Sequence, residues 1–326
     1  MNAVTQLEPQ TMEATLANYA IGDLQRYWPA ANGIENSNYF VQAIKDKSRQ
    51  EYVLTIMEQA ANAADAYVPM MDTLEAGGLP VAPPLRNRAN QAIDEVAGKP
   101  AMLQRRLPGQ HTYNPTIRQI SALGRFIARM HQTMHQAPVS LPQHPRDLHW
   151  LKERKDMVNG YLAYADQALI NDSVNRIASL LARTDVQNLP QGMIHGDLFR
   201  DNVLFNEHGL SGVLDFHHAA QGWYIYDLAV AANDWCNDAG GGLDPERTLQ
   251  LLRAYHQIRP LTSAELWFFS SFALYAGVSF WLSRLAVALS RDNAGLVRFK
   301  NPDEFRTIVQ HHHRHAFYFD ERQLTL

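Results

Sequence analysis

The sequence predicts an α+β fold with two lobes, of which the first is a small antiparallel sheet with one main helix. Three observations support it. The chain has 326 residues, which is long for a single core. β-Branched and aromatic runs are concentrated in the first third of the chain, whereas apolar residues recur at helical spacing after Pro115. We therefore expect a sheet lobe over residues 1–107 and a larger, mostly helical lobe over 108–326.

In the first lobe, we expect a short helix over residues 11–20. The runs YFVQAI (39–44) and YVLTIM (52–57) are typical of strands, and the polar residues between them predict an antiparallel hairpin. An alanine-rich helix is expected over 60–76, with Gly77 and Gly78 as its C-terminal cap. Two further strands are expected within 92–107, with Gly98 and Lys99 at their turn.

In the second lobe, most of the chain reads as helix, and the break between lobes falls at Leu107-Pro108-Gly109. Strand-like runs return only near residues 193–216, at VLF (203–205) and GVL (212–214). Helices are expected over residues 117–134, 148–168, 171–184, 246–258, 263–290 and 302–316.

Composition excludes several classes of protein. The formal net charge is −4, with 29 basic and 33 acidic side chains and no dense basic stripe, which argues against a nucleic-acid partner. The single cysteine, Cys236, excludes a disulfide within the chain. The start of the sequence has no secretory pattern, and serines and Arg284 interrupt the most apolar segment, near 266–290. We therefore expect a cytoplasmic protein with no membrane partner.

A short polar stretch stands out at residues 195–205, which read HGDLFRDNVLF, and GVLDF follows. The Asp197 carboxylate can accept a hydrogen bond from an alcohol and orient it for attack. Asn202 and Asp215 supply oxygen ligands of the kind that Mg²⁺ prefers. His195 is expected to hold the loop. One carboxylate for the acceptor and two oxygen ligands for a metal are what phosphoryl transfer needs.

This stretch resembles the catalytic loop of the aminoglycoside phosphotransferase-like kinases, which are similar to protein kinases in fold. Further motifs make the whole chain similar to the bacterial homoserine kinase branch of that superfamily. These motifs are GIENSNYFV (33–41), EYVLTIME (51–58), GLPVAPPL (78–85), MIHGDLFRDNVLF (193–205), YDLAVAANDWC (226–236), FWLSRL (280–285) and FKNPDEF (299–305). The resemblance implies a protein-kinase-like fold, ATP and Mg²⁺ as cofactors, and phosphorylation of L-homoserine to O-phospho-L-homoserine, a step toward threonine.

The resemblance also implies roles for individual residues. Asp197 would be the catalytic carboxylate, and Asn202 and Asp215 would bind Mg²⁺. The loop that covers the phosphates would match residues 33–38, and the adenine would lie near the backbone of residues 104–107. We therefore expect the nucleotide ligands to be Asn36, Ser37, Asn38, Gln104 and Leu107.

The acceptor is expected to be a small amino acid, which carries both charges. Arg200 is the candidate for its carboxylate, with a structural ion pair as the alternative, and Asp234 is the candidate for its ammonium. Asp227 is expected to stabilise the catalytic loop. Kinases of this type usually carry a lysine in the third strand, but the matching position here falls near Thr55, which leaves the cation that clamps the phosphates unassigned.

Two alternatives stay open at this point. One is a kinase of the same fold that acts on another small alcohol, such as choline, ethanolamine, an aminoglycoside or a sugar. A choline site would need an aromatic cage, and an aminoglycoside site would need many carboxylates. The other alternative is a catalytically silent nucleotide-binding protein, which the missing strand lysine favours and the intact Asp197, Asn202 and Asp215 oppose.

Overall fold

The computed structural model describes residues 5–30, 36–58, 64–238, 240–289 and 300–324. The chain folds as two compact units, Met1–Pro108 and Gly109–Leu326. The first unit holds an antiparallel sheet and the second is mostly helical, which confirms the expected α+β class. The expected roles of the two lobes, nucleotide binding in the first and catalysis in the second, stay predictions.

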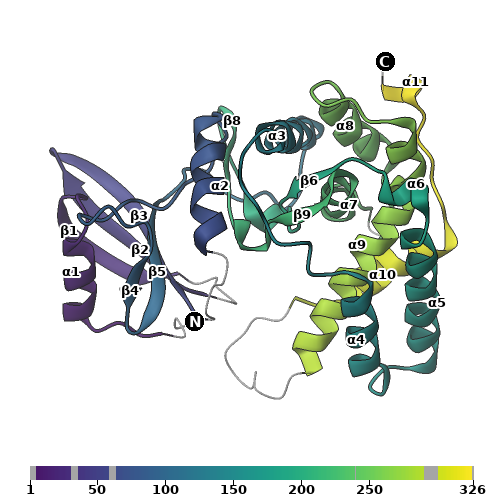
Figure 1. The fold of residues 1–326 in the computed structure, drawn as a ribbon, viewed down its shortest axis with the longest axis horizontal. Helices are drawn as coiled ribbons and strands as arrows, with labels where there is room; N and C mark the ends of the chain where they lie inside the picture. Colours follow the sequence, from purple (N-terminus) through teal and green to yellow (C-terminus); the bar gives the residue numbers. More distant parts are fainter. Residues whose placement is uncertain (1–4, 31–35, 59–63, 239, 290–299, 325–326) are drawn as a thin grey trace. The chain divides into compact units, whose positions relative to one another are not determined.

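The first unit is built on a five-stranded antiparallel sheet in the order β1-β2-β3-β5-β4 (Figure 1). The predicted hairpin is confirmed: β2 (Asn36–Lys45) and β3 (Ser48–Met57) pair along their whole length. Asp46 and Lys47 make its two-residue turn with positive φ angles, as the twist of a tight hairpin favours. The strands β4 (Asp94–Val96) and β5 (Lys99–Arg105) form the second predicted pair.

One face of this sheet packs against α1 (Pro9–Ala17). Buried and half-buried residues alternate along β2, because successive side chains of a strand point to opposite faces. The core between helix and sheet is formed by Met12, Leu16, Tyr39, Val41, Ala43, Leu54, Ile56, Ala101 and Leu103, among others. The other helix of this unit, α2 (Ala64–Ala76), ends where predicted, with Gly78 at a φ of 74°.

The structure corrects three expectations in this unit. An edge strand, β1 (Asp23–Pro29), was not predicted. Residues 36–38 begin β2 instead of forming a loop, and the expected loop residues 33–35 lie outside the described residues. The turn between β4 and β5 is made by Ala97 and Gly98, both at positive φ, so it falls one residue earlier than expected.

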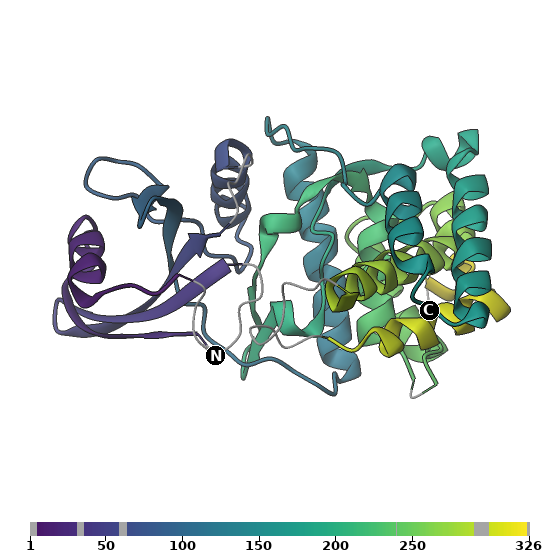
Figure 2. The same ribbon diagram turned by 90° about the horizontal axis from the view of Figure 1, so that it is seen from below.

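The second unit is organised around the long helix α9 (Ser263–Leu289) (Figure 2). The helices α4 (Leu148–Asn159), α5 (Tyr164–Leu181), α7 (Tyr224–Trp235) and α10 (Pro302–Arg314) all pack against it. A separate pair, α3 (Ile117–His135) and α8 (Pro245–His256), packs together. Short helices α6 (Thr184–Gln187) and α11 (Glu321–Leu324) complete the unit.

Two expectations about these helices are corrected. The break between α4 and α5 falls near Gly160, because glycine is a poor helix residue, and not at residues 168–171. Helix α7 was not predicted: nearly every one of its side chains is buried, so it shows no amphipathic period. By length and composition alone α9 could cross a membrane, but 61% of its most apolar window is buried in the protein, as in the core helix of a soluble protein.

Two small antiparallel strand pairs carry the polar stretch. The strand β6 (Gln191–Ile194) pairs with β9 (Ala220–Trp223), and β7 (Val203–Asn206) pairs with β8 (Gly209–Val213). Single 3₁₀ turns, η1 (Arg200–Asn202) and η2 (Phe216–His218), lie between them. The HGDLFRDN stretch therefore connects β6 to β7, and the second aspartate follows β8.

Candidate active site

The loop that holds Asp197 begins where β6 ends. Gly196 has a φ of 76°, in the left-handed region that favours glycine, and this turns the chain away from the strand. A Cβ atom at Gly196 would lie 3.3 Å from the His218 carbonyl oxygen, so a larger residue would also be crowded. The turn directs the chain into Asp197 and then into η1.

Asp227, on α7, anchors this loop. Its carboxylate accepts hydrogen bonds from the backbone amides of His195 and Gly196, each at 2.8 Å, and from Nε2 of His131 at 3.0 Å. His131 and Asp227 are fully buried, and burial lowers the pKa of His131. Burial alone would raise the pKa of Asp227, but the hydrogen bond from His131 and the backbone amides outweigh it and lower that pKa. This is the stabilising role expected of Asp227.

Three further hydrogen bonds, two through His195 and one from Trp235, hold the loop in place. The His195 ring is buried, and its Nε2 donates to the carbonyl oxygen of Leu214 at 2.9 Å, while its Nδ1 accepts from the Asp197 amide at 3.3 Å. The indole of Trp235 donates to the carbonyl oxygen of Leu198 at 2.9 Å. His195 therefore links the HGDLFRDN loop to the residue before Asp215, which agrees with its expected scaffold role.

Asp197 and Asn202 lie together. The Asn202 Nδ2 donates to the Asp197 backbone carbonyl at 2.8 Å and to its Oδ2 at 3.0 Å. This orientation leaves the Asn202 Oδ1 available as a neutral oxygen ligand. Because both residues belong to one short loop, the spacing in HGDxxxxN is enough to bring them into contact.

The electrostatic setting of Asp197 is unusual for a carboxylate. Desolvation raises its pKa to about 7, against the opposing influence of the Arg146 and His218 charges, which lower it. Nearby Asp215 raises the pKa of Asp197 further. A carboxylate whose pKa lies near neutrality is suited to exchange a proton with an alcohol.

Asp215 follows β8 and is exposed, with a φ of 61°. This left-handed conformation is uncommon outside glycine, and aspartate is one of the residues that tolerate it. Among the described residues, no group of three or more His, Cys, Asp or Glu side chains could hold a metal ion alone. Two oxygen ligands, Asn202 and Asp215, fit Mg²⁺ better than a transition metal, since Mg²⁺ commonly keeps several waters and binds substrate phosphates.

Arg200 and Asp234 contact each other. The Asp234 carboxylate accepts from Nε and Nη2 of Arg200 at 3.1 Å each, and from the Arg200 amide at 2.7 Å. The Nη1 of Arg200 donates to the carbonyl oxygen of Tyr113 at 2.6 Å. This arrangement favours the structural ion pair that the sequence left open as an alternative. Separate roles for the two side chains in holding the acceptor stay predictions.

In the first unit, the position expected for a lysine is occupied by a neutral pair. Thr55 is buried and donates to the Oδ1 of Asn38 at 2.7 Å. Ser37 points to the opposite face of the sheet, where its hydroxyl donates to Glu58. The nucleotide ligands expected at residues 36–38 therefore begin β2, and the Ser37 hydroxyl is already engaged.

Glu58 has a cationic partner that the sequence did not suggest. Lys99, at the start of β5, forms an ion pair with Glu58, and Thr5 donates to the same carboxylate at 2.7 Å. Burial by itself raises the pKa of Glu58, but hydrogen bonds from Lys99, Ser37 and Thr5 outweigh it and lower the pKa to about 2. No motif marks this pair, because the two residues lie far apart in the sequence.

The residues expected near the adenine lie on or after β5. Gln104 is half-buried, and its side-chain amide donates to the carbonyl oxygen of Ala82. Leu107 is half-buried and lies just after the end of β5. Both are placed in the first unit, and their roles as nucleotide ligands stay predictions.

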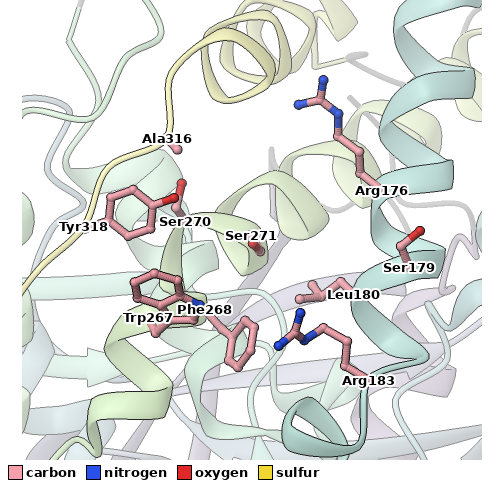
Figure 3. A pocket seen from close by; sticks show the side chains of 10 residues that line it. All are labelled: Arg176, Ser179, Leu180, Arg183, Trp267, Phe268, Ser270, Ser271, Ala316 and Tyr318. Carbon is pink, nitrogen blue, oxygen red and sulfur yellow. The ribbon is translucent and has the colours of Figure 1, made fainter.

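A pocket of about 350 Å³ lies elsewhere on the second unit, lined by Arg176, Arg183, Trp267 and Tyr318 among others (Figure 3). Both arginines already have carboxylate partners: Arg176 pairs with Asp172 and Arg183 with Asp185. The residues of the HGDLFRDN loop do not line this pocket, so it is separate from the candidate active site.

Comparison with known proteins identifies the family. The model of the phosphotransferase enzyme family matches residues 27–261. The homoserine kinase of Pseudomonas aeruginosa (strain UCBPP-PA14) is 38% identical over 289 residues, which cover 88% of this chain and 89% of that protein. Homoserine kinase of Cupriavidus necator (strain ATCC 17699) is 33% identical over 317 residues, covering 95% of this chain and 96% of that protein.

Solved structures show the fold. A microcompartment-associated aminopropanol kinase matches with a TM-score of 0.72 and 18% identity, over 94% of this chain and 97% of that one. The fold similarity and the family match agree with each other, since both extend across the two units. The chain therefore belongs to the phosphotransferase enzyme family.

Proposed function

We propose that the protein transfers the γ-phosphoryl group of ATP to the hydroxyl of L-homoserine, giving ADP and O-phospho-L-homoserine. The observation that carries this proposal is the near full-length similarity to homoserine kinases, at 38% identity over 88% of the chain. The geometry of the HGDLFRDN loop supports the same reaction class, because a carboxylate of near-neutral pKa lies beside Asn202, whose side-chain oxygen is suited to bind a cation.

In the proposed mechanism, Asp197 accepts a hydrogen bond from the acceptor hydroxyl and orients that oxygen toward the γ-phosphorus. As the new P–O bond forms and the bond to ADP breaks, the hydroxyl proton passes to the Asp197 carboxylate. Asp227 and His195 hold the loop, so that Asp197 needs little rearrangement before the reaction.

We propose that Asn202 and Asp215 hold Mg²⁺. A divalent cation supplies charge neutralisation on the phosphate oxygens as the phosphoryl group is transferred. In this chain the Asn202 side chain is oriented by its hydrogen bonds to Asp197, and Asp215 is held next to Leu214, whose carbonyl is bonded to His195. The same contacts therefore hold Asp197, Asn202 and the residue before Asp215 in one loop arrangement.

We propose that the first unit binds the nucleotide. In the sequence-based assignment, residues 36–38 meet the phosphates, and Gln104 and Leu107 lie near the adenine. The ion pair between Glu58 and Lys99 joins the end of β3 to β5 and stabilises the start of β2 through Ser37, so it supports the strand that begins with Asn36. Lys99 is thus engaged in an ion pair with Glu58.

The proposed function is tested by measuring ADP release from Mg²⁺-ATP with a panel of acceptors. The panel contains L-homoserine, L-serine, choline, ethanolamine and an aminoglycoside. Homoserine is expected to give the highest kcat/KM by about tenfold or more, a difference of about 1.4 kcal/mol in transition-state binding. Turnover on another acceptor without homoserine-dependent ADP release would show that the enzyme is a different small-alcohol kinase. Absence of turnover on every acceptor, in a protein that binds ATP, would favour a silent nucleotide-binding protein.

A further inference from the structure

Arg146 is a charged residue beside the catalytic loop that no motif marks. It lies just before α4, in a segment that is hydrogen-bonded to β9. The backbone amide of Gln221 donates to the Pro142 carbonyl at 2.7 Å, and the backbone amide of His144 donates to the backbone carbonyl of Gln221 at 2.9 Å. The strand β9 pairs with β6, which leads directly into the loop of Asp197. The backbone hydrogen bonds therefore fix the position of the Arg146 segment relative to the loop that carries Asp197.

Side-chain packing brings this segment onto the loop itself. The ring of His144 lies 4.5 Å from the ring of Tyr226, measured between centroids. A Cβ atom at Gly196 would be 3.7 Å from the Nε2 of His144, so the glycine before Asp197 faces this ring at van der Waals range. Arg146 is two residues further along, and its charge is the largest influence that lowers the pKa of Asp197.

The flat face of the Arg146 guanidinium stacks on an aromatic ring. It lies over the ring of Phe280, with 3.9 Å from Cζ to the ring centroid, and the Arg146 carbonyl accepts from the hydroxyl of Tyr275. Stacking occupies the flat face of a guanidinium and leaves the N–H groups at its edge free to bind a planar anion. Phe280 is buried and packs against Phe199 of the catalytic loop.

The edge of this guanidinium has an unsatisfied donor in the described part of the chain. The Arg146 Nη1 is buried and makes no hydrogen bond there. The hydroxyl of Tyr226, which is fully buried, makes no hydrogen bond of full length and angle within the described residues, although Arg146 and Ser279 lie close enough to lower its pKa. Buried donors without acceptors are costly, so they are expected to be satisfied when a ligand binds.

Two other cations near the loop, both in the described part of the chain, are engaged. Arg200 is paired with Asp234 and with the Tyr113 carbonyl, and Lys300 is paired with Asp201. Arg146 differs from both, because its Nη1 is buried and unpaired within the described residues. Its neighbour Tyr226 is close enough that the Arg146 charge lowers the Tyr226 pKa, against the larger effect of burial, which raises it.

We propose that Arg146 binds the carboxylate of the acceptor amino acid, with the Tyr226 hydroxyl as a second donor, and that this contact selects amino acids over amino alcohols. The inference rests on the proposed function, in which the acceptor hydroxyl meets Asp197. The carboxylate then satisfies the buried guanidinium edge, while an amino alcohol leaves it unpaired. It also replaces the sequence-based choice of Arg200 for this contact.

The test compares two acceptors that differ only in the carboxylate: L-homoserine and 3-aminopropan-1-ol. Steady-state ADP release is measured for the wild type, Arg146→Met and Arg146→Lys. In Arg146→Met, the ratio of kcat/KM for homoserine to kcat/KM for aminopropanol is expected to fall by about 30- to 1,000-fold, as for truncation of one partner of a buried charge pair. Arg146→Lys keeps the charge and is expected to retain an intermediate ratio.

A binding measurement covers the case in which aminopropanol turns over too slowly to measure. Calorimetric titration of L-homoserine into the complex with Mg²⁺ and AMP-PNP is expected to show a Kd weaker by about 30-fold or more in Arg146→Met, with AMP-PNP affinity within about threefold of wild type. Thermal unfolding of each variant checks that the protein is folded. Arg200→Met tests the sequence-based alternative for the carboxylate contact. Arg129→Met, at an exposed position of α3, is the matched control, and its homoserine Kd is expected to stay within about threefold of wild type.

The outcomes separate this inference from the proposed function. Equal losses on both acceptors, or a selective loss in Arg200→Met and not in Arg146→Met, would overturn the role of Arg146 while homoserine turnover by the wild type stands. Wild-type turnover on an acceptor without a carboxylate, and none on homoserine, would overturn both. Turnover on L-serine alone would overturn only the proposed substrate, because the same comparison then applies to serine and ethanolamine.

Discussion

The carboxylate of Asp234 accepts three hydrogen bonds from Arg200, at 2.7 Å from its backbone amide and at 3.1 Å from both Nε and Nη2. Arg200 belongs to the HGDLFRDN loop and Asp234 to α7, so this ion pair links the loop to the helix that also supplies Asp227. A two-point contact of this kind fixes the orientation of both groups. It therefore positions the loop.

The Arg200–Asp234 pair predicts a strong coupling in stability. The pair is partly buried, with side chains 33% and 16% exposed, so removing either partner leaves the other unpaired. Arg200→Met and Asp234→Asn are each expected to destabilise the protein, and the double variant to lose less than their sum by about 1–3 kcal/mol. Urea unfolding of the four proteins measures this coupling. Additive losses would mean that the ion pair contributes no stability.

Asp197→Asn is expected to remove the proposed proton acceptor. It should lower kcat by about 10²- to 10⁴-fold, while AMP-PNP affinity stays within about threefold of wild type. Asp201→Asn is the matched control, because Asp201 lies in the same loop but pairs with Lys300 at the surface. Steady-state ADP release and calorimetry give the two quantities. Near-wild-type kcat in Asp197→Asn would exclude Asp197 from proton transfer.

Removal of either proposed metal ligand should weaken the binding of Mg²⁺ and so lower the rate at limiting Mg²⁺. Asn202→Ala and Asp215→Asn are each expected to raise the Mg²⁺ concentration that gives half-maximal rate by about tenfold or more, since each loses one oxygen ligand. Excess Mg²⁺ should restore part of the rate in these variants, but not in Asp197→Asn. Mg²⁺ titrations of the initial rate test this. An unchanged Mg²⁺ midpoint in both variants would contradict the assignment.

The anchor at Asp227 predicts a large loss of stability. Its carboxylate is fully buried and accepts hydrogen bonds from two backbone amides and from His131. Asp227→Ala leaves these donors without an acceptor, and we expect a loss of about 3–5 kcal/mol. Asp172→Ala removes a half-exposed partner of Arg176 and should cost at most about 1 kcal/mol. Similar unfolding midpoints in the two variants would contradict this account.

Glu58 predicts a pH-dependent contribution to stability. Its pKa is lowered in the folded state from 4.5 to about 2, so its contribution is present above pH 4.5 and is lost as the pH falls through 2. Glu58→Gln is expected to lower the free energy of unfolding at neutral pH by about 1–3 kcal/mol. The difference from wild type should shrink as urea unfolding is repeated at progressively more acidic pH.

A matched control for this prediction is Glu75→Gln, since Glu75 is an exposed residue of α2. It is expected to change the free energy of unfolding by no more than about 0.5 kcal/mol at any pH. A destabilisation by Glu58→Gln that is the same at neutral pH and at the acidic end of the series would show that its cause is packing and not the charge of the carboxylate.

The parts of the fold that the sequence predicts well are those with a local signal. The β2–β3 hairpin is predicted because two β-branched runs flank a polar turn, and α3 because its apolar residues recur along one face. Strand β1 is missed because it is largely exposed and shows little alternation, and α7 because burial on all sides removes the helical period.

The HGDxxxxN loop follows from the sequence alone, because Asp197 and Asn202 are five residues apart and their contact needs only a short turn. Three other features depend on how distant segments fold together. They are the pair of Arg200 with Asp234, the pair of Lys99 with Glu58, and the burial of the unpaired Nη1 of Arg146. Arg200 and Asp234 are 34 residues apart in the sequence, and Lys99 and Glu58 are 41 residues apart. Spacing along the chain carries no information about such pairs, because packing of separate strands and helices brings them together.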